Sequence, residues 1–233
     1  RWFNASACKL TPQQFIEIKN LNFVKEVTPM ITETVFADGN SYKELHKGEQ
    51  GLLEGQIASM QGKEFTKKGL TGKGIRICII DAGFPDVNTS SIYQHIRDNN
   101  RIIKTWDFKK NKPDIYKYSS HGSTVLSCIA GKTDGVFIGL AIDSEFLLAR
   151  TERILYEGDA EEEDWLMAIE WADKNGADIV NSSLGYTSAR HFVEDMDGKT
   201  CIISKAGNLA ARKGILVINA AGNDGDGNWK YIG

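Results

Sequence analysis

The chain contains several short apolar runs, and segments with helical spacing lie between them. An apolar run without alternation is typical of a strand that is covered on both faces, as in a parallel sheet. Helical segments between such runs supply the crossover connections that parallel strands require. This order predicts an α/β fold, a doubly wound parallel sheet with helices on both faces. The predicted strands are residues 75–80, 146–149, 179–181 and 215–221, and the predicted helices are residues 122–131, 161–175 and 204–213.

The residues before this alternation read as a smaller unit. Thr11-Pro12 precedes apolar residues at helical spacing, which predicts a capped amphipathic helix, and residues 23–27 resemble a strand. One α-β unit of this size is too small to fold alone. The residues after it show no clear period up to about residue 55, which favours a linker or surface arm. We therefore expect three parts: a small α-β unit at 1–36, a linker or arm at 37–55, and the main domain at 56–233.

Composition argues against two classes of partner. The chain has 233 residues and a formal charge of -3 at pH 7, so it offers no basic surface for nucleic acid or an anionic membrane. No apolar run reaches the roughly 20 residues that a membrane span needs. The chain opens at Arg1 without a charged and apolar leader, so we expect any signal peptide to lie upstream.

The four cysteines are scattered along the chain, with no pair at metal-ligand spacing: Cys8, Cys78, Cys128 and Cys201. Two of them, Cys78 and Cys128, lie in apolar runs, so we expect both thiols to be buried as small hydrophobic groups. The sequence therefore predicts no structural metal site.

Polar residues lie at an end of three of the predicted elements. Asp81 follows the first predicted strand, His121-Gly122 opens a helix, and Gly222-Asn223 follows the last strand. Because the carboxyl ends of parallel strands meet at one edge of a sheet, these residues can converge there. Each also has a simpler explanation: an Asp after a strand can cap a turn, a His-Gly pair can be an exposed helix start, and Gly-Asn suits a turn.

Four motifs resemble, in their order along the chain, those of the subtilisin-like serine proteases, the subtilases. Residues 79–83 (IIDAG) resemble the family's aspartate motif, and residues 121–125 (HGSTV) resemble its histidine motif. Residues 181–185 (NSSLG) resemble its substrate-binding strand, and residues 220–223 (AAGN) resemble the segment with its oxyanion-hole asparagine. Residues 2–5 and the helix and strand after them resemble, more loosely, the end of the family's inhibitory pro-region. The four motifs together are far more specific than any one of them.

The resemblance implies a serine endopeptidase. His121 would be the general base toward a serine hydroxyl and then the general acid toward the leaving amine. Asp81 would hold the tautomer of the imidazole and stabilise the imidazolium. Asn223 would donate its side-chain amide to the developing oxyanion.

The resemblance also implies how a protein or peptide substrate binds. An extended substrate would pair with the backbone after the third predicted strand, as an added strand. The residues that we expect to contact it are Ser182, Ser183, Leu184, Gly185 and Gly222. The implied enzyme is secreted or periplasmic and is made as a zymogen.

One motif of the family is not in the sequence. The family's serine lies in a Gly-Thr-Ser motif well downstream of the oxyanion asparagine, and the chain stops ten residues after Asn223. We therefore expect a catalytic domain that is truncated at its C-terminus, inactive alone, and partnered by the missing part of the same domain. Ala82 stands where many relatives carry Thr or Ser, which removes a hydroxyl beside Asp81.

Two alternatives to an active protease stay open on the sequence. A pseudoprotease or peptide-binding module would keep the cleft without a nucleophile. An unrelated doubly wound domain would bind a nucleotide or accept a phosphoryl group at Asp81. Against the second alternative, Gly69, Gly72 and Gly74 precede the first strand, whereas the glycines of a dinucleotide fingerprint follow one.

Acidic residues crowd the start of the predicted helix at 161–175, where carboxylates favourably meet the helix dipole. They are Glu157, Asp159, Glu161, Glu162, Glu163 and Asp164. We expect a solvated face there, although subtilases often bind calcium and a calcium site is an alternative. The implied chemistry requires no cofactor. No motif surrounds His46, His95 or His191, so we expect surface or packing residues.

Overall fold

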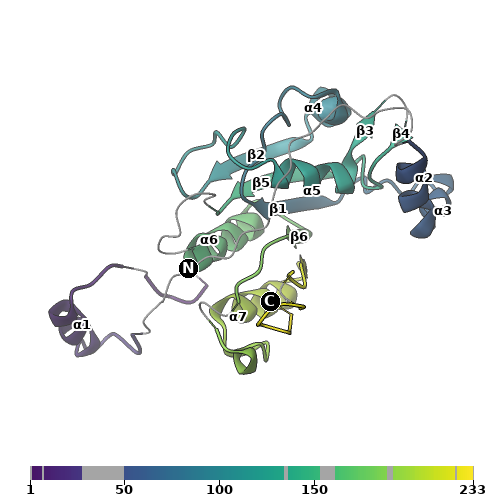
Figure 1. Ribbon diagram of the computed structural model, residues 1–233. Coiled ribbons are helices and arrows are strands. Elements are labelled where there is room, and N and C mark those ends of the chain that lie inside the picture. Colours follow the sequence, from purple (N-terminus) through teal and green to yellow (C-terminus); the bar gives the residue numbers. More distant parts are fainter. Residues whose placement is uncertain are drawn as a thin grey trace.

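The computed structural model of the chain has at its centre a parallel sheet with helices on both sides (Figure 1). It describes residues 2–6, 8–27, 50–133, 136–152, 161–187, 191–223 and 225–232. The sheet has five strands in the order β2-β5-β1-β6-β7, and each neighbouring pair is parallel. The predicted α/β fold class is confirmed. The strands are β1 (Arg76–Asp81), β2 (Ile102–Asp107), β5 (Glu145–Arg150), β6 (Ile179–Ser182) and β7 (Leu216–Asn219).

Strand β1 lies in the middle of the sheet and aligns the polar ends of its neighbours. Asp81 of β1 is paired with Arg150 of β5, and Ile80 of β1 is paired with Ser182 of β6. Ser182 is in turn paired with Asn219 of β7. The carboxyl ends of these strands therefore meet at one edge of the sheet, which is where sites form in folds of this class.

Helices cover both faces of the sheet. Helix α5 (His121–Ala130) covers one face, and α6 (Glu161–Lys174) and α7 (Ile202–Arg212) cover the other (Figure 1). Alternate residues of β1 and β5 therefore enter two separate cores, which explains why the strands read as continuous apolar runs. Cys78, Ile80, Leu147 and Ala149 pack with Trp165, Ile169, Ala206 and Ala210, whereas Ile77, Ile79, Phe146 and Leu148 pack with Leu126 and Ala130.

Shorter elements flank this core. Helix α2 begins at Gln50, inside the range 37–55 for which the sequence predicts a linker or surface arm, and its residue Ile57 is buried. The helical part that packs on the main domain thus starts before residue 56, and residues 28–49 lie outside the described residues. The shorter elements that flank the core are α2 (Gln50–Ser59), α3 (Gly62–Lys67), η1 (Ser91–Tyr93), α4 (Gln94–Asp98), η2 (Val193–Asp195), and the hairpin of β3 (Lys132–Thr133) and β4 (Val136–Phe137).

The N-terminal residues contain the predicted helix but not the predicted strand. Helix α1 (Pro12–Lys19) begins with a capping box: the Thr11 hydroxyl accepts from the Gln14 N–H at 3.3 Å, and the Gln14 side chain accepts from the Thr11 N–H at 2.9 Å. Residues 23–27 form no strand, and the Phe23 side chain is 80% exposed. A strand needs a neighbour for its backbone groups, and no described strand pairs with this segment.

One of the two burial predictions for cysteine is wrong. All four cysteines are free thiols, and Cys78 is buried as expected, but Cys128 is exposed. Helix α5 packs on the sheet through Leu126 and Ala130. A helix on a sheet buries only one stripe, and Cys128 lies outside that stripe although its neighbours in sequence are apolar.

The acidic start of α6 is not the solvated face that the sequence predicted. Glu161, Glu162 and Asp164 are only 0%, 6% and 8% exposed. Partners from other elements compensate for this burial: Asp164 pairs with Lys109 Nζ at 2.7 Å, and Glu162 pairs with His191 Nε2 at 2.8 Å. Within the described ranges, the helices are too short or too polar to cross a lipid bilayer.

Candidate active site

Asp81 is the last residue of β1, and its carboxylate is fully buried at the carboxyl edge of the sheet. Its Oδ1 accepts a hydrogen bond from the Ala82 backbone N–H at 2.7 Å. Burial raises the pKa of Asp81, while the hydrogen bond and charge interaction with His121 oppose the rise. The loop after β1 and one imidazole therefore hold this carboxylate in place.

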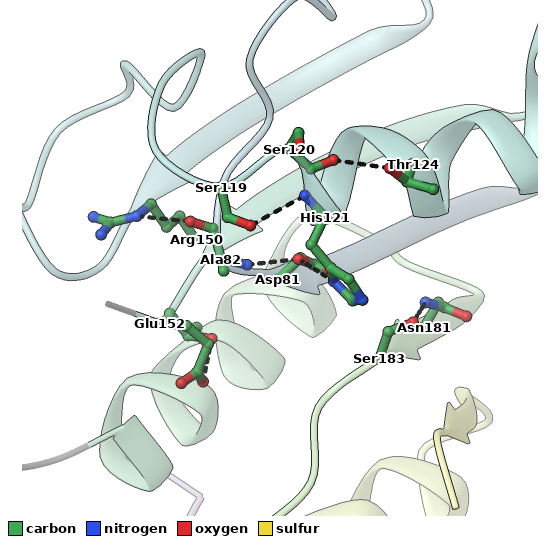
Figure 2. Close-up of polar contacts among 11 residues, drawn as sticks. Asp81, Ala82, Ser119, Ser120, His121, Thr124, Arg150, Glu152, Asn181 and Ser183 are labelled. Carbon is green, nitrogen blue, oxygen red and sulfur yellow. Dashed lines mark hydrogen bonds and ion pairs between the residues drawn. The ribbon is translucent and has the colours of Figure 1, made fainter. Parts of the chain in front are cut away.

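His121 is the first residue of α5, and its ring faces Asp81 (Figure 2). Its Nδ1 lies 2.8 Å from Oδ1 and 3.0 Å from Oδ2 of the Asp81 carboxylate. The hydrogen bond to Asp81 raises the pKa of His121, and burial of the ring partly offsets this rise. The carboxylate occupies Nδ1, so Nε2 is the nitrogen left to exchange a proton with a third group.

Glycine at position 122 permits the close approach of His121 to Asp81. A Cβ at Gly122 would lie 2.4 Å from the Gly83 carbonyl oxygen and 2.9 Å from Cβ of Asp81. The Ser119 hydroxyl also fixes the helix start, because it accepts a hydrogen bond from the His121 N–H at 3.1 Å. The tight packing of the α5 N-terminus on the loop after β1 thus explains the His-Gly pair.

The predicted substrate segment begins at the end of β6. Ser182 is buried, and its hydroxyl accepts a hydrogen bond from Trp165 Nε1 at 3.0 Å, so its side chain belongs to the core. The Ser183 hydroxyl accepts from Asn181 Nδ2 at 3.1 Å (Figure 2). Ser182 can therefore take part in binding a peptide only through its backbone.

Leu184 and Gly185 lie beside the end of β7 and the residues that follow it. Asn219 Nδ2 donates to the Leu184 carbonyl oxygen at 3.1 Å, and a Cβ on Gly185 would lie 4.0 Å from Cα of Gly222. A cavity of about 240 Å³ opens next to them, with Gly185 and Tyr186 in its wall. The structure thus brings the predicted residues 184, 185 and 222 together at one edge.

Asn223 lies four residues beyond the end of β7, and its side chain is exposed. Gly222 precedes it with φ of +86°, a backbone conformation that favours glycine. In the described part of the chain, no hydrogen bond joins Asn223 to Asp81 or His121. The predicted role of Asn223 stays a prediction.

The sequence reasoning missed two charged residues that are buried at the same edge, Arg150 and Glu152. Glu152 is 7% exposed, and the Tyr186 hydroxyl donates to its Oε1 at 2.8 Å. Burial, followed by repulsion from Glu161, raises the pKa of Glu152 to about 8. Arg150 is 3% exposed and pairs with Asp107. The sequence signal for both is that charged residues directly follow an apolar run, at the point where a strand ends.

No cluster of three or more His, Cys, Asp or Glu side chains that could hold a metal ion occurs within the described ranges. Residues 157 and 159 of the acidic stretch lie outside these ranges, so the calcium site stays an untested alternative.

Comparison with known proteins gives the subtilase family, which the motifs resemble, along most of the chain. The model of the subtilase family matches residues 72–232. The minor extracellular protease Epr of Bacillus subtilis is 30% identical over 195 residues, which cover 82% of this chain and 27% of that protein. Subtilisin Savinase of Lederbergia lenta is 26% identical over 179 residues, which cover 75% of this chain and 57% of that protein. The chain therefore spans between 27% and 57% of the length of these two relatives.

Among solved structures, the CspB protease of Clostridium perfringens has a TM-score of 0.58 at 17% identity. The match covers 73% of this chain and 41% of that chain. A likeness at this level of identity supports the fold alone.

Proposed function

The chain belongs to the subtilase family, and on this premise we propose that the protein containing it is a serine endopeptidase that hydrolyses peptide bonds in protein substrates. The observation that carries the proposal is the 2.8 Å contact between Asp81 and His121 at the carboxyl edge of the sheet. An imidazole held at one nitrogen by a buried carboxylate is the base that a serine nucleophile needs.

In the proposed mechanism, Nε2 of His121 takes the proton of the serine hydroxyl as the oxygen attacks the peptide carbonyl carbon. The imidazolium that forms is stabilised by the Asp81 carboxylate, which stays ionised. His121 then gives the proton to the leaving amine as the C–N bond breaks, and a water that loses its proton to the same Nε2 hydrolyses the acyl-serine ester and restores the hydroxyl. Because the chain spans only part of the length of its relatives, we propose that the serine belongs to the remainder of the protein.

Asn223 is the proposed oxyanion donor. Its side chain is exposed, and the preceding Gly222 lies against Gly185 of the proposed substrate segment, so a carbonyl bound there can come near the Asn223 amide. Such a donor contributes about 3 to 4 kcal/mol to transition-state stabilisation in a subtilisin.

The substrate is proposed to lie extended along residues 183–185, with Gly222 on the other side of the groove. Pairing would use backbone groups, so many sequences would bind, and side-chain cavities would set the preference. The cavity with Tyr186 in its wall is one such cavity. Ser182 would contribute its backbone only, because its side chain is buried against Trp165.

Three further properties belong to the proposal. The protein is secreted, as the name of the Bacillus subtilis relative suggests for that protein, and it is made as a zymogen. Proton transfer and attack by these groups require no metal or cofactor. A calcium ion, where one binds, would have a structural role.

The test uses the longer gene product that contains this chain. We expect it to react covalently with a serine-directed fluorophosphonate and to cleave a denatured protein substrate. His121→Ala should abolish cleavage, because the serine loses its base, while circular dichroism stays unchanged. His95→Gln is the matched control, since His95 lies on α4 beside Ala130, at the opposite end of α5 from His121, and it should retain cleavage.

Two outcomes contradict the proposal. Cleavage that survives His121→Ala would remove His121 from the site. A gene product that binds peptides but neither cleaves them nor reacts with the fluorophosphonate would favour the alternative, a pseudoprotease or peptide-binding module.

A further inference from the structure

Arg150 is the last residue of β5, paired in register with Asp81 on β1. Its side chain is buried, and it makes three contacts that point to different parts of the fold. Its Nη1 lies 3.0 Å from both oxygens of the Asp107 carboxylate, and its Nε donates to the Ala82 carbonyl oxygen at 3.1 Å (Figure 2). The guanidinium carbon also lies 3.6 Å from the centre of the Tyr118 ring.

Two of these contacts belong to the loops that carry the catalytic pair. Ala82 directly follows Asp81, and Tyr118 lies three residues before His121. The loops also touch each other directly, because Gly83 forms an isolated bridge with Tyr118. Arg150 therefore holds the loop after Asp81 and the loop before His121 at the same time.

The third contact anchors the arginine. Asp107 is the last residue of β2 and is fully buried. Its Oδ1 also accepts from the Lys110 N–H at 3.0 Å, so a turn after β2 holds the carboxylate. An arginine guanidinium is planar and carries its donors in a fixed fork, so the pairing with Asp107 sets the direction of Nε as well.

Charge alone does not account for this arrangement. The Asp107 carboxylate neutralises the guanidinium, and a buried ion pair adds little net stability compared with apolar packing. What the pair supplies is geometry at the point where the two loops meet.

We propose that Arg150 is a positioning residue that ties the loop after Asp81 to the loop before His121 and so fixes the carboxylate against the imidazole. The effect of Arg150 on catalysis rests on the proposed function, whereas the effect of Arg150 on the Asp81–His121 contact does not. The two can therefore be tested separately.

The first test is a titration of the His121 ring by NMR in the chain labelled at histidine. The hydrogen bond to Asp81 raises the pKa of His121, so a looser contact should lower it toward 6.5. We expect this in Arg150→Met and also in Arg150→Lys, which keeps the charge but cannot contact Asp107 and the Ala82 carbonyl with one planar fork. Tyr118→Leu, at a partly exposed position, keeps the ion pair, removes the stacked ring and should shift His121 in the same direction.

Arg76→Met is the matched control. Arg76 pairs with Glu145 at 2.6 Å at the opposite ends of the same two strands, so it tests loss of an ion pair between β1 and β5 without touching either loop. Its thermal midpoint should fall while the His121 titration stays unchanged. An unchanged His121 titration in folded Arg150→Lys and Tyr118→Leu would overturn the proposal, as would an equal shift in Arg76→Met.

The second test measures peptide cleavage by the longer gene product. A positioning role predicts that Arg150→Lys lowers kcat by about tenfold or more and leaves KM nearly unchanged, because misplacement of a catalytic group by a fraction of an ångström acts on the chemical step. A purely structural role would lower the amount of folded enzyme without moving the pH profile. If the wild-type product cleaves nothing, the proposed function fails, and the NMR titration still decides the role of Arg150.

Discussion

Asp81 and His121 each change the titration of the other. The Asp81 carboxylate raises the pKa of His121 above 6.5, so the protonated imidazole stabilises the folded state. This contribution is fully present below the unfolded pKa and is lost as the pH rises through the folded pKa. The contact is thus both the core of the proposed site and a source of pH-dependent stability.

Asp81→Asn should separate these effects. It removes the negative charge, so we expect the pKa of His121 to fall toward 6.5. In the longer gene product, kcat should fall by about 10⁴-fold, because the imidazole is held in the wrong tautomer. An NMR titration of the His121 ring checks the first effect and peptide hydrolysis checks the second; a His121 titration that does not move would show that the carboxylate has no effect on the ring.

Glu152 is a second residue whose charge state the fold controls. Burial and the neighbouring Glu161 raise its pKa from 4.5 to about 8, so the folded state holds a proton that the unfolded chain releases between these pH values. Stability should therefore decrease as the pH rises through this window, by at most about 1.4 kcal/mol per pH unit for one proton.

Glu152→Gln should remove this part of the pH dependence. The amide is neutral at every pH and keeps an oxygen that accepts from the Tyr186 hydroxyl. The measurement is the thermal midpoint of wild type and variant from pH 4.5 to 8. Glu54→Gln, on the exposed side of α2, is the control and should follow the wild-type curve. Parallel curves for Glu152→Gln and wild type would contradict the burial of a proton at this position.

At the scale of single elements, the N-terminus of α5 depends on the absence of a side chain at position 122. A Cβ there would lie 2.4 Å from the Gly83 carbonyl oxygen, so Gly122→Ala must push the helix away from the loop. We expect a loss of about 1 to 3 kcal/mol in the free energy of unfolding in urea, typical of overpacking. Because His121 is the adjacent residue, its contact with Asp81 should loosen as well.

Gly55→Ala in α2 is the matched comparison. A Cβ at Gly55 meets nothing within 4 Å, so the substitution tests helix propensity alone. We expect it to stabilise the protein by about 0.5 to 1 kcal/mol, because alanine loses less conformational entropy than glycine in a helix. Equal effects at the two positions would show that the packing at Gly122 does not matter.

The sequence predicts most strands and helices of the core because the apolar residues of each follow the pattern typical of its type. The runs at β1 and β5 are apolar on both faces, and helices cover both faces of the sheet there. Strand β2 was missed because Lys104 and Thr105 interrupt its apolar residues, as suits a strand at the edge of the sheet. The strand at 23–27 was predicted from propensity, but a strand also needs a neighbour.

The same distinction applies to the site. The sequence points to Asp81 and His121 because each lies in a short motif and the set of motifs resembles that of the subtilases, and the structure places the two side chains in contact. Arg150 was not predictable, because its burial depends on Asp107, which lies 43 positions earlier in the chain on a strand that the sequence did not reveal. A partner from another element is visible only in the folded molecule.

At the scale of the whole molecule, strand β7 ends the described sheet with apolar side chains in contact with solvent. Leu216 is 57% exposed and Ile218 is 48% exposed, while Val217 between them packs toward α7. The first two side chains therefore point to the face of the sheet opposite α7. An open edge that is also apolar is prone to pair with another chain.

This strand gives a prediction about the chain alone and about the longer protein. We propose that a later part of the same protein covers β7, which is consistent with the share of its relatives that the chain spans. The chain alone should then associate with itself as its concentration rises, measured by light scattering, and Ile218→Lys should reduce this association. In the longer gene product the same substitution should lower the thermal midpoint, because the lysine would be buried without a partner.

Leu70→Lys is the control, at a 54% exposed position outside the strands, and it should change neither the association of the chain nor the thermal midpoint of the longer product. A chain that stays monomeric at all concentrations, or a longer product that tolerates Ile218→Lys, would show that β7 is a true outer edge.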